Sequence, residues 1–145
     1  MSGVLARKVR AALDVLVAAA AVRRARRAVA RRAVGDLVGR SGPTIPTVDP
    51  SALSAEARRN GERWGAAVDR ALRWTPGDAA CVVRAGALHE LLVSRGLPRA
   101  AVCIGVRRGP DGFEAHAWVE HDGIPIAEPM VLRGAFSTLE GVTLR

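Results

Sequence analysis

The sequence is poor in cysteine and in long apolar runs. Its two cysteines cannot make a disulfide framework, and they form no Cys-x-x-Cys or Cys/His cluster that would suggest zinc. A reducing cytoplasm is therefore the expected compartment. The longest weakly polar run, residues 11–22, has 12 residues and includes Asp14, whereas a membrane-spanning helix needs about 20. Arginines follow at residues 23–27, where a signal peptide would have a small-residue cleavage site, so we expect the segment to be retained.

The formal net charge of +8 comes from one end of the chain. Residues 1–43 carry nine arginines and one lysine against two aspartates, and residues 44–145 carry twelve arginines against twelve acidic residues. Binding to nucleic acid or to a membrane would thus depend on the N-terminal segment alone. With 49% hydrophobic and 25% charged residues in a chain of 145, the composition indicates one globular domain and not a disordered protein.

Helix-forming residues fill the N-terminal segment. Residues 4–38 contain no proline and one glycine, which predicts one long helix, or two with a break in the Arg-rich stretch. The apolar positions that recur at helical spacing are Leu5, Val9, Leu13, Leu16 and Ala20. Residues 41–50 contain three prolines and are expected to form a linker or an extended segment.

Two more helices and then strands are predicted after this linker. One helix is expected from a serine cap, Ser51 or Ser54, to about Leu72. The other begins after the turn at residues 74–78 and ends at Gly96, since glycine suits the left-handed end of a helix. Strand patterns then follow at residues 101–106, 113–120 and 124–128, separated by glycine-containing turns. Helices followed by an antiparallel meander predict an α+β fold.

Cys81 falls in the first turn of the second of these helices. Helix N-termini present free N–H groups and a partial positive charge, which stabilise a thiolate and can hold an oxyanion. His116, in the strand at residues 113–120, is the candidate base, because a helix packed on that sheet can bring imidazole and thiol together. The alternative is that Cys81 is a small buried hydrophobic residue and that His116 is structural.

A third group should orient the histidine, and Glu128 is the first candidate. If residues 121–123 form a three-residue loop, Glu128 lies opposite His116 on one face of the hairpin. A two-residue loop would turn Glu128 to the other face. Glu114 and Glu120 share the strand face of His116 in a regular strand, so they remain alternatives.

The other residues of these types have expected roles that are mainly structural. Cys103 lies in the middle of a strand and is expected in the core. His89 is about 12 Å along the helix from Cys81, too far to be its base. Trp74 is expected in the core or as a wall of the substrate cleft, and Trp118 in the core or in contact with substrate.

The order of these motifs resembles the leader peptidases of lasso-peptide biosynthesis, which are called B2 or C-terminal B proteins. The resemblance covers about residues 55–132, from the helix-start Cys81 through the strand. Its most specific part is the string Ala-His-Ala-Trp-Val-Glu-x-Asp-Gly at residues 115–123. It implies a transglutaminase-like, papain-related α+β fold, with N-terminal helices before an antiparallel sheet that packs on the cysteine-bearing helix. We expect a basic helical arm and proline-rich linker at residues 1–50 and the peptidase domain at residues 51–145.

The resemblance also implies an activity and its partners. The family uses a Cys–His–Asp triad, which maps onto Cys81, His116 and position 128, where this sequence has glutamate. The implied reaction is cleavage of a ribosomal precursor between leader and core, without a metal or another cofactor. The implied partners are the precursor's leader peptide, a separate leader-binding (B1) protein and the ATP-dependent cyclase that closes the core.

Two other classes of function stay open. A transglutaminase-like acyltransferase would use the same triad with an amine in place of water as the acceptor. A non-enzymatic protein would use the basic arm to bind an acidic partner, an anionic membrane or nucleic acid. Nucleic acid is not expected and a membrane is not favoured, and the arm could equally be the solvated face of a packed helix.

Overall fold

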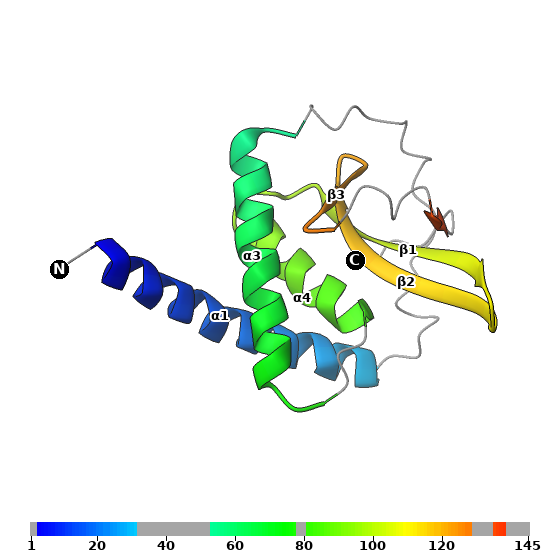
Figure 1. Ribbon diagram of the computed structural model, residues 1–145, viewed down its shortest axis with the longest axis horizontal. Helices are drawn as coiled ribbons and strands as arrows, with labels where there is room; N and C mark the ends of the chain where they lie inside the picture. Colours follow the sequence, from blue (N-terminus) through cyan, green and yellow to red (C-terminus); the bar gives the residue numbers. More distant parts are fainter. Residues whose placement is uncertain (1–2, 32–52, 78–80, 129–134, 139–145) are drawn as a thin grey trace.

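The computed structural model describes residues 3–31, 53–77, 81–128 and 135–138. The helices in these residues are α1 (Gly3–Arg31), α3 (Ala55–Trp74) and α4 (Cys81–Ser94). The strands are β1 (Ala100–Gly109), β2 (Gly112–His121), β3 (Ile124–Ile126) and β4 (Ser137–Thr138). They form one sheet in the order β3-β2-β1-β4, and neighbouring strands are antiparallel. Figure 1 shows these helices gathered on one side of the sheet, which confirms the predicted α+β fold.

Capping residues fix the start of α3 and the end of α4. The Ser54 hydroxyl accepts a hydrogen bond from the Ala57 backbone N–H at 3.1 Å, which confirms the predicted serine cap. Just after the end of α4, Gly96 has a φ of +100°. The Leu97 N–H then donates to the Leu92 carbonyl at 2.9 Å, the bond expected for a helix that ends on a left-handed glycine.

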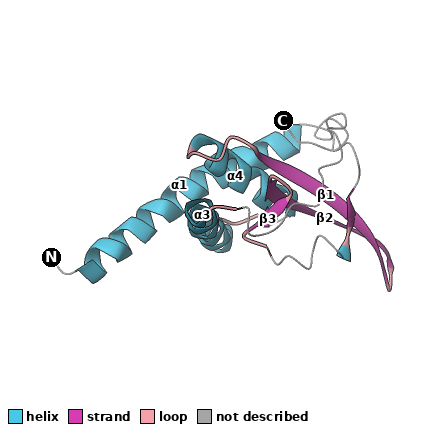
Figure 2. Cartoon of the chain, turned by 90° about the horizontal axis from the view of Figure 1, so that it is seen from above, coloured by secondary structure: helices cyan, strands magenta, loops and turns pink. Residues whose placement is uncertain are grey.

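An apolar core joins the helices to one face of the sheet. Its members include Ala18, Ala21 and Val22 from α1; Trp64, Ala67, Val68 and Ala71 from α3; Leu88, Leu91 and Leu92 from α4; and Val102, Ala117, Val119, Ile124 and Ile126 from the strands. Because side chains alternate along a strand, the neighbours of these strand residues lie on the opposite face. The view from above in Figure 2 shows α1, α3 and α4 as a helical layer beside β1 and β2.

The α1 helix packs by a face other than its leucine face. It runs unbroken through the Arg-rich stretch, and its buried residues are Asp14, Ala18, Ala21 and Val22. Leu5, Val9, Leu13 and Leu16 are instead 48–67% exposed. Small side chains allow α1 to approach α3 and α4 closely. The spacing therefore predicted the helix correctly, and the leucine face that it marks is turned to solvent.

Charged side chains tie α1 to the other helices. Asp14 accepts two hydrogen bonds from Arg63 of α3, at 2.6 and 2.7 Å. Arg24 pairs with Glu90 of α4 at 2.6 Å, and Arg26 donates to the backbone carbonyls of residues 75–77. None of the helices described combines the length and the apolarity of a membrane span. The predicted domain boundary at residue 50 lies outside the described residues.

The hairpin between β2 and β3 has the two-residue loop, and not the three-residue loop that would place Glu128 opposite His116. His121 pairs with Ile124, and only Asp122 and Gly123 lie between them. These two residues have φ values of 51° and 79°, and a type I′ turn requires positive φ at both positions. In this register, a β3 strand that continued without a break would place Glu128 on the face of the sheet opposite to His116.

We predict that Asp14→Ala lowers the free energy of unfolding by about 1–3 kcal/mol, because it leaves Arg63 without the carboxylate that holds α1 against α3. The Asp14 side chain is 12% exposed. Urea unfolding measures the loss. The control is Arg24→Ala, whose ion pair with Glu90 is 55% and 42% exposed and should lower the free energy of unfolding much less, because water and salt screen an exposed pair. Equal losses in the two variants would contradict the anchoring role of Asp14.

Candidate active site

The helix α4 is described from Cys81 onward, so Cys81 lies in its first turn, as the sequence predicted. It is half-buried and packs against the apolar core. Its helix packs against β2, the strand that carries His116. Arg84 follows one helical turn later, about 4.5 Å along the axis. Arg84 therefore starts one turn from Cys81 on the same helix, and the thiol itself makes no hydrogen bond to another described residue.

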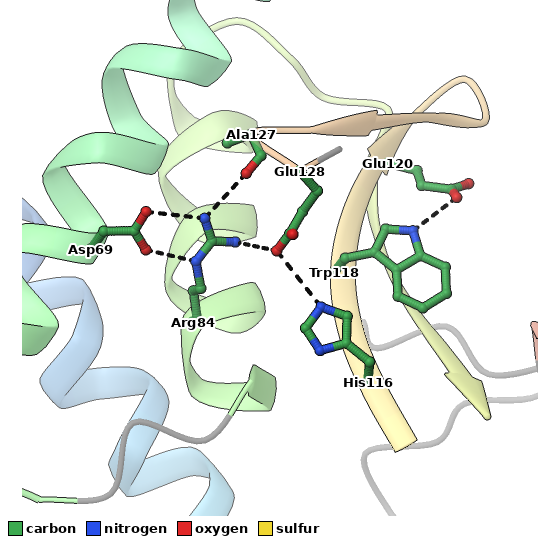
Figure 3. A network of polar contacts seen from close by, with 7 residues as sticks. All are labelled: Asp69, Arg84, His116, Trp118, Glu120, Ala127 and Glu128. Atoms are coloured by element: carbon green, nitrogen blue, oxygen red, sulfur yellow. Dashed lines mark hydrogen bonds and ion pairs between the residues drawn. The ribbon is translucent and has the colours of Figure 1, made fainter. Parts of the chain in front are cut away.

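The imidazole of His116 and the carboxylate of Glu128 lie together, as Figure 3 shows. Nε2 of His116 is 3.8 Å from Oε1 of Glu128, and the side chains are 27% and 12% exposed. Nε2 is buried and has no hydrogen-bond partner among the described residues. A shortening of about 0.6 Å would bring the pair within hydrogen-bond distance. The site thus holds an unsatisfied imidazole nitrogen that faces a carboxylate.

Glu114 and Glu120, the alternative partners of His116, are engaged elsewhere. Oε2 of Glu114 accepts a hydrogen bond from Arg107 at 2.6 Å. Glu120 is 2% exposed and accepts the indole N–H of Trp118 at 2.9 Å. Within the part of the chain that the structure describes, neither carboxylate comes within 4.0 Å of the imidazole.

Arg84 holds the Glu128 carboxylate from the side of α4 (Figure 3). Its Nη1 donates to Glu128 Oε1 at 2.7 Å, and its Nε and Nη2 donate to Asp69 of α3 at 2.7 and 3.2 Å. Nη2 also donates to the Ala127 carbonyl at 3.2 Å. Burial by itself lowers the pKa of the Arg84 guanidinium, but the hydrogen bond to Asp69 and the charges of Asp69 and Glu128 raise that pKa above its usual value. The guanidinium therefore stays charged.

Sequence reasoning did not identify Arg84 or Asp69. The one available signal for Arg84 was its position one turn after Cys81, which places it on a neighbouring part of the helix surface. No pattern in the sequence linked Asp69 to Arg84, because their contact depends on how α3 crosses α4.

Glu128 reaches His116 through a break in the strand and not through the predicted register. The strand β3 ends at Ile126, and the next residue, Ala127, has a φ of +54°. A residue with a Cβ adopts this left-handed conformation at a cost of about 1–2 kcal/mol. The turn ends the alternation of side chains, so Glu128 approaches the imidazole even though the loop before β3 has two residues.

Two glycines of α3 make room for this turn. A Cβ at Gly61 would collide with the side chain of Ile126, and a Cβ at Gly65 would collide with the Cβ of Ala127. Asp69 continues the same face of α3 at the next four-residue step. One face of α3 thus accepts the end of β3, then Ala127, and then supplies the carboxylate that binds the arginine.

Aromatic rings surround the imidazole on the sheet. The ring of Trp118 lies at a centroid distance of 6.0 Å and nearly parallel to His116, and the ring of Phe136 lies at 5.7 Å. Trp118 is fully buried, so it is inaccessible to a substrate here and supports the imidazole instead. The absence of a side chain at Gly105 leaves the space that Trp118 and Phe136 occupy. No sequence signal pointed to Phe136.

Trp74, expected in the core or as a wall of the substrate cleft, lies outside the core, and Cys103, expected in the core, is half-buried. Trp74 is 80% exposed. It lines a surface hollow of about 390 Å³ together with Arg23, Arg26, Arg27, Thr75 and Pro76. Cys103 is half-buried and pairs with Trp118, which places it on the same face of the sheet as His116.

The other histidines have separate surroundings. Burial lowers the pKa of His89, against the opposing effects of its hydrogen bond to the Ala100 backbone and of the Glu90 charge. Nδ1 of His121 lies 3.5 Å from Asp122 in the hairpin turn. Across the described residues, no three His, Cys, Asp or Glu side chains form a group that could hold a metal ion.

Comparison with protein families assigns the chain to a superfamily. The sequence model of the transglutaminase-like superfamily matches residues 3–140. The chain belongs to the transglutaminase-like superfamily. Members of this superfamily are typically cysteine-dependent enzymes. The match to the transglutaminase-like superfamily includes α1 as well as the helix and strands that carry Cys81 and His116. Comparison with curated proteins and with solved structures finds no match.

We predict that Gly65→Ala destabilises the protein, although alanine favours a helix over glycine by about 1 kcal/mol. The added methyl group would displace Ala127 and with it Glu128. The matched control is Gly86→Ala, whose methyl group would meet Ala25 at an ordinary 3.6 Å and should raise stability by about 0.5–1 kcal/mol. Thermal unfolding of both variants tests this, and a gain in stability for Gly65→Ala would contradict the close packing described.

Proposed function

We propose that this protein is a cysteine peptidase that removes the leader from a ribosomal lasso-peptide precursor. The observation that carries the proposal is the His116–Glu128 pair, whose carboxylate is bound by Arg84 of α4, three residues after Cys81. Membership of the transglutaminase-like superfamily supports cysteine-dependent chemistry. The string at residues 115–123 supports the lasso-peptide branch of that chemistry.

In the proposed reaction, His116 first takes the proton of the Cys81 thiol. Because Nε2 faces Glu128, Nδ1 is the nitrogen that receives this proton, and the carboxylate stabilises the N–H on Nε2. The thiolate attacks the carbonyl carbon of the scissile bond, and free backbone N–H groups at the start of α4 stabilise the oxyanion. The intermediate then loses the amine, to which the imidazolium returns the proton.

A second half-reaction releases the leader. The leader remains bound to Cys81 as a thioester, and His116 takes a proton from the water that attacks it. The thioester carbon–sulfur bond breaks, the thiolate regains a proton, and the leader leaves as a carboxylic acid. The net reaction is hydrolysis of one peptide bond by one water molecule.

The proposed partners are those of a split leader-processing system. They are the precursor's leader peptide, a separate leader-binding (B1) protein that presents it, and the cyclase that uses the new core amine. The proposed place of action is the cytoplasm, where precursor, protease and ATP-dependent cyclase would meet.

Acyl transfer to an amine is the second candidate, because superfamily membership is as compatible with an acyltransferase as with a peptidase. The two activities differ in what attacks the thioester. Mass spectrometry of the leader fragment, with a primary amine added to the reaction, separates them. A leader that ends in a carboxylic acid supports the peptidase, and a leader amide of the added amine supports the acyltransferase.

We predict that Cys81→Ala lowers the rate of leader cleavage by at least about 10³-fold, because removal of a nucleophile leaves only binding and oxyanion stabilisation. The assay follows cleavage of the precursor by mass spectrometry in the presence of the leader-binding protein. The control is Cys103→Ala, which removes the chain's other thiol and should retain a rate near that of the wild type. Undiminished cleavage by Cys81→Ala would refute the proposal.

We predict that Arg84→Gln lowers kcat by about 10–100-fold with little change in KM, because a displaced Glu128 no longer orients His116. Arg84 is a positioning residue here, since it acts through the carboxylate that it binds at 2.7 Å. Arg84→Lys keeps the charge but not the fork of donors, so its kcat should lie between those of wild type and Arg84→Gln.

The control for Arg84 is Arg99→Gln, which breaks an exposed ion pair with Asp122 and should leave kcat unchanged. The melting temperature of each variant is measured alongside the kinetics. A purely structural role for Arg84 would lower the melting temperature and the active fraction of enzyme without restoring kcat in the lysine variant. That result would contradict the positioning role.

A further inference from the structure

The α1 helix turns a line of large apolar side chains away from the rest of the protein. Leu5, Val9, Leu13 and Leu16 are 48%, 50%, 56% and 67% exposed. Their spacing of four, four and three residues keeps them on one side of the helix. Figure 1 shows that the N-terminal part of α1 projects beyond the other helices. An apolar line of this kind on a protein surface commonly marks a binding site.

The same line continues into positive charge. Steps of four, three and four residues from Leu16 lead to Ala20, Arg23 and Arg27. Both arginines are exposed, and no described residue forms an ion pair or hydrogen bond with either. We call the line from Leu5 through Leu16 to Arg23 and Arg27 the outward face. It extends over about 33 Å of helix.

A tryptophan stands at the basic end of the outward face. Arg23 and Arg27 line the surface hollow of about 390 Å³ that Trp74 also lines. Trp74 is 80% exposed, although tryptophan is among the residues that contribute most to binding energy at interfaces. The outward face therefore ends in a place where acidic side chains could pair with arginine while an apolar group covers the indole.

We infer that the outward face binds an amphipathic helix of a partner protein, whose apolar residues lie along Leu5–Leu16 and whose acidic residues lie against Arg23 and Arg27. The spacing of the line from Val9 onward alternates between four and three residues, which is the pattern of a two-helix seam. The inference concerns binding alone and does not rest on the proposed reaction.

Charge excludes a second copy of α1 as the natural occupant. The helix carries eight basic residues, and its one acidic residue, Asp14, points inward to Arg63. A parallel pair of copies would set Arg23 and Arg27 against the same arginines, and an antiparallel pair would set them against leucines. An acidic helix avoids both the repulsion between arginines and the burial of arginine against leucine, and its carboxylates pair with Arg23 and Arg27.

A membrane surface fits the outward face less well. A helix that lies in a membrane interface keeps an apolar face along its length and its basic residues on the other side. Here Arg23 and Arg27 lie in the middle of the face, in line with the leucines. Nucleic acid would pair with the arginines but would leave the leucines uncovered.

The test uses a synthetic helical peptide of about 28 residues, four heptads, with leucines at the seam positions of one half and glutamates at those of the other. Binding to the full chain is measured by titration calorimetry and by tryptophan fluorescence. Trp64 and Trp118 are 3% and 0% exposed, so a blue shift that disappears in Trp74→Phe reports contact at the basic end. A peptide of scrambled sequence should not bind.

Two double variants assign the binding to the outward face. Leu13→Glu with Leu16→Glu should weaken the peptide at least about tenfold, because two leucine contacts are lost. Arg23→Glu with Arg27→Glu should weaken it about tenfold at low salt. A peptide with lysine in place of glutamate should bind this second variant more tightly than the glutamate peptide does, and should bind the wild type poorly. The controls are Val93→Glu and Arg59→Glu, exposed residues outside the outward face, which should change nothing.

Several results would overturn the inference. One is no binding of the peptide, or binding that neither double variant weakens. Another is a wild-type chain that dimerises in size-exclusion chromatography with light scattering and becomes monomeric when Leu13 and Leu16 are replaced, because the occupant would then be a second copy. A third is binding to anionic phosphatidylglycerol vesicles or to a DNA oligonucleotide that exceeds binding to the peptide.

Discussion

The arrangement of the candidate site depends on one guanidinium group. Arg84 joins α4 to Asp69 of α3 and to Glu128 beyond β3, and it also binds the Ala127 carbonyl. Three elements that are distant in sequence thus meet at a single charged side chain. A partly buried cation of this kind is costly unless its donors find acceptors. Here two carboxylates and a carbonyl supply those acceptors, so the same contacts that satisfy the arginine also fix the position of Glu128.

This fixed carboxylate explains how an irregular strand end can serve a precise purpose. The left-handed conformation of Ala127 is unfavourable by itself, but the close approach to Gly65 and the hydrogen bond to Arg84 hold it. Unfavourable backbone conformations that the surrounding structure holds in place are common near functional sites. The buried Nε2 of His116, which has no hydrogen-bond partner among the described residues, faces Glu128, the residue after Ala127. The left-handed conformation of Ala127 and the unsatisfied Nε2 of His116 each cost free energy, which the packing of the rest of the protein offsets.

The α1 helix is an integral part of the same structure. Ala18, Ala21 and Val22 belong to the core that α3, α4 and the sheet share, and the superfamily match includes the helix. Its buried side is made of alanine, valine and one paired aspartate, while its large side chains face outward. Stability therefore comes from close packing of small residues, and the leucines remain available for binding. The positive charge of the chain follows the same division, since Arg24 and Arg26 serve the fold and Arg23 and Arg27 remain on the outward face.

Local patterns in the sequence predicted the helices, the strands and several of their ends. Ser54 and Gly96 marked helix ends, Cys81 marked a helix start, and alternation marked the strand of His116, because caps, turns and alternation depend on residues close together in the chain. Tertiary structure decided the rest. The packed face of α1, the two-residue loop at Asp122, the turn at Ala127 and the binding of Glu128 by Arg84 each depend on how closely separate elements approach. The two-residue loop would turn Glu128 of a regular strand away from His116. The packing of α3 against Ala127 and the hydrogen bonds from Arg84 place Glu128 beside His116 instead. Local patterns carry no information on such distances, because they arise from the volume and charge of residues far away in sequence.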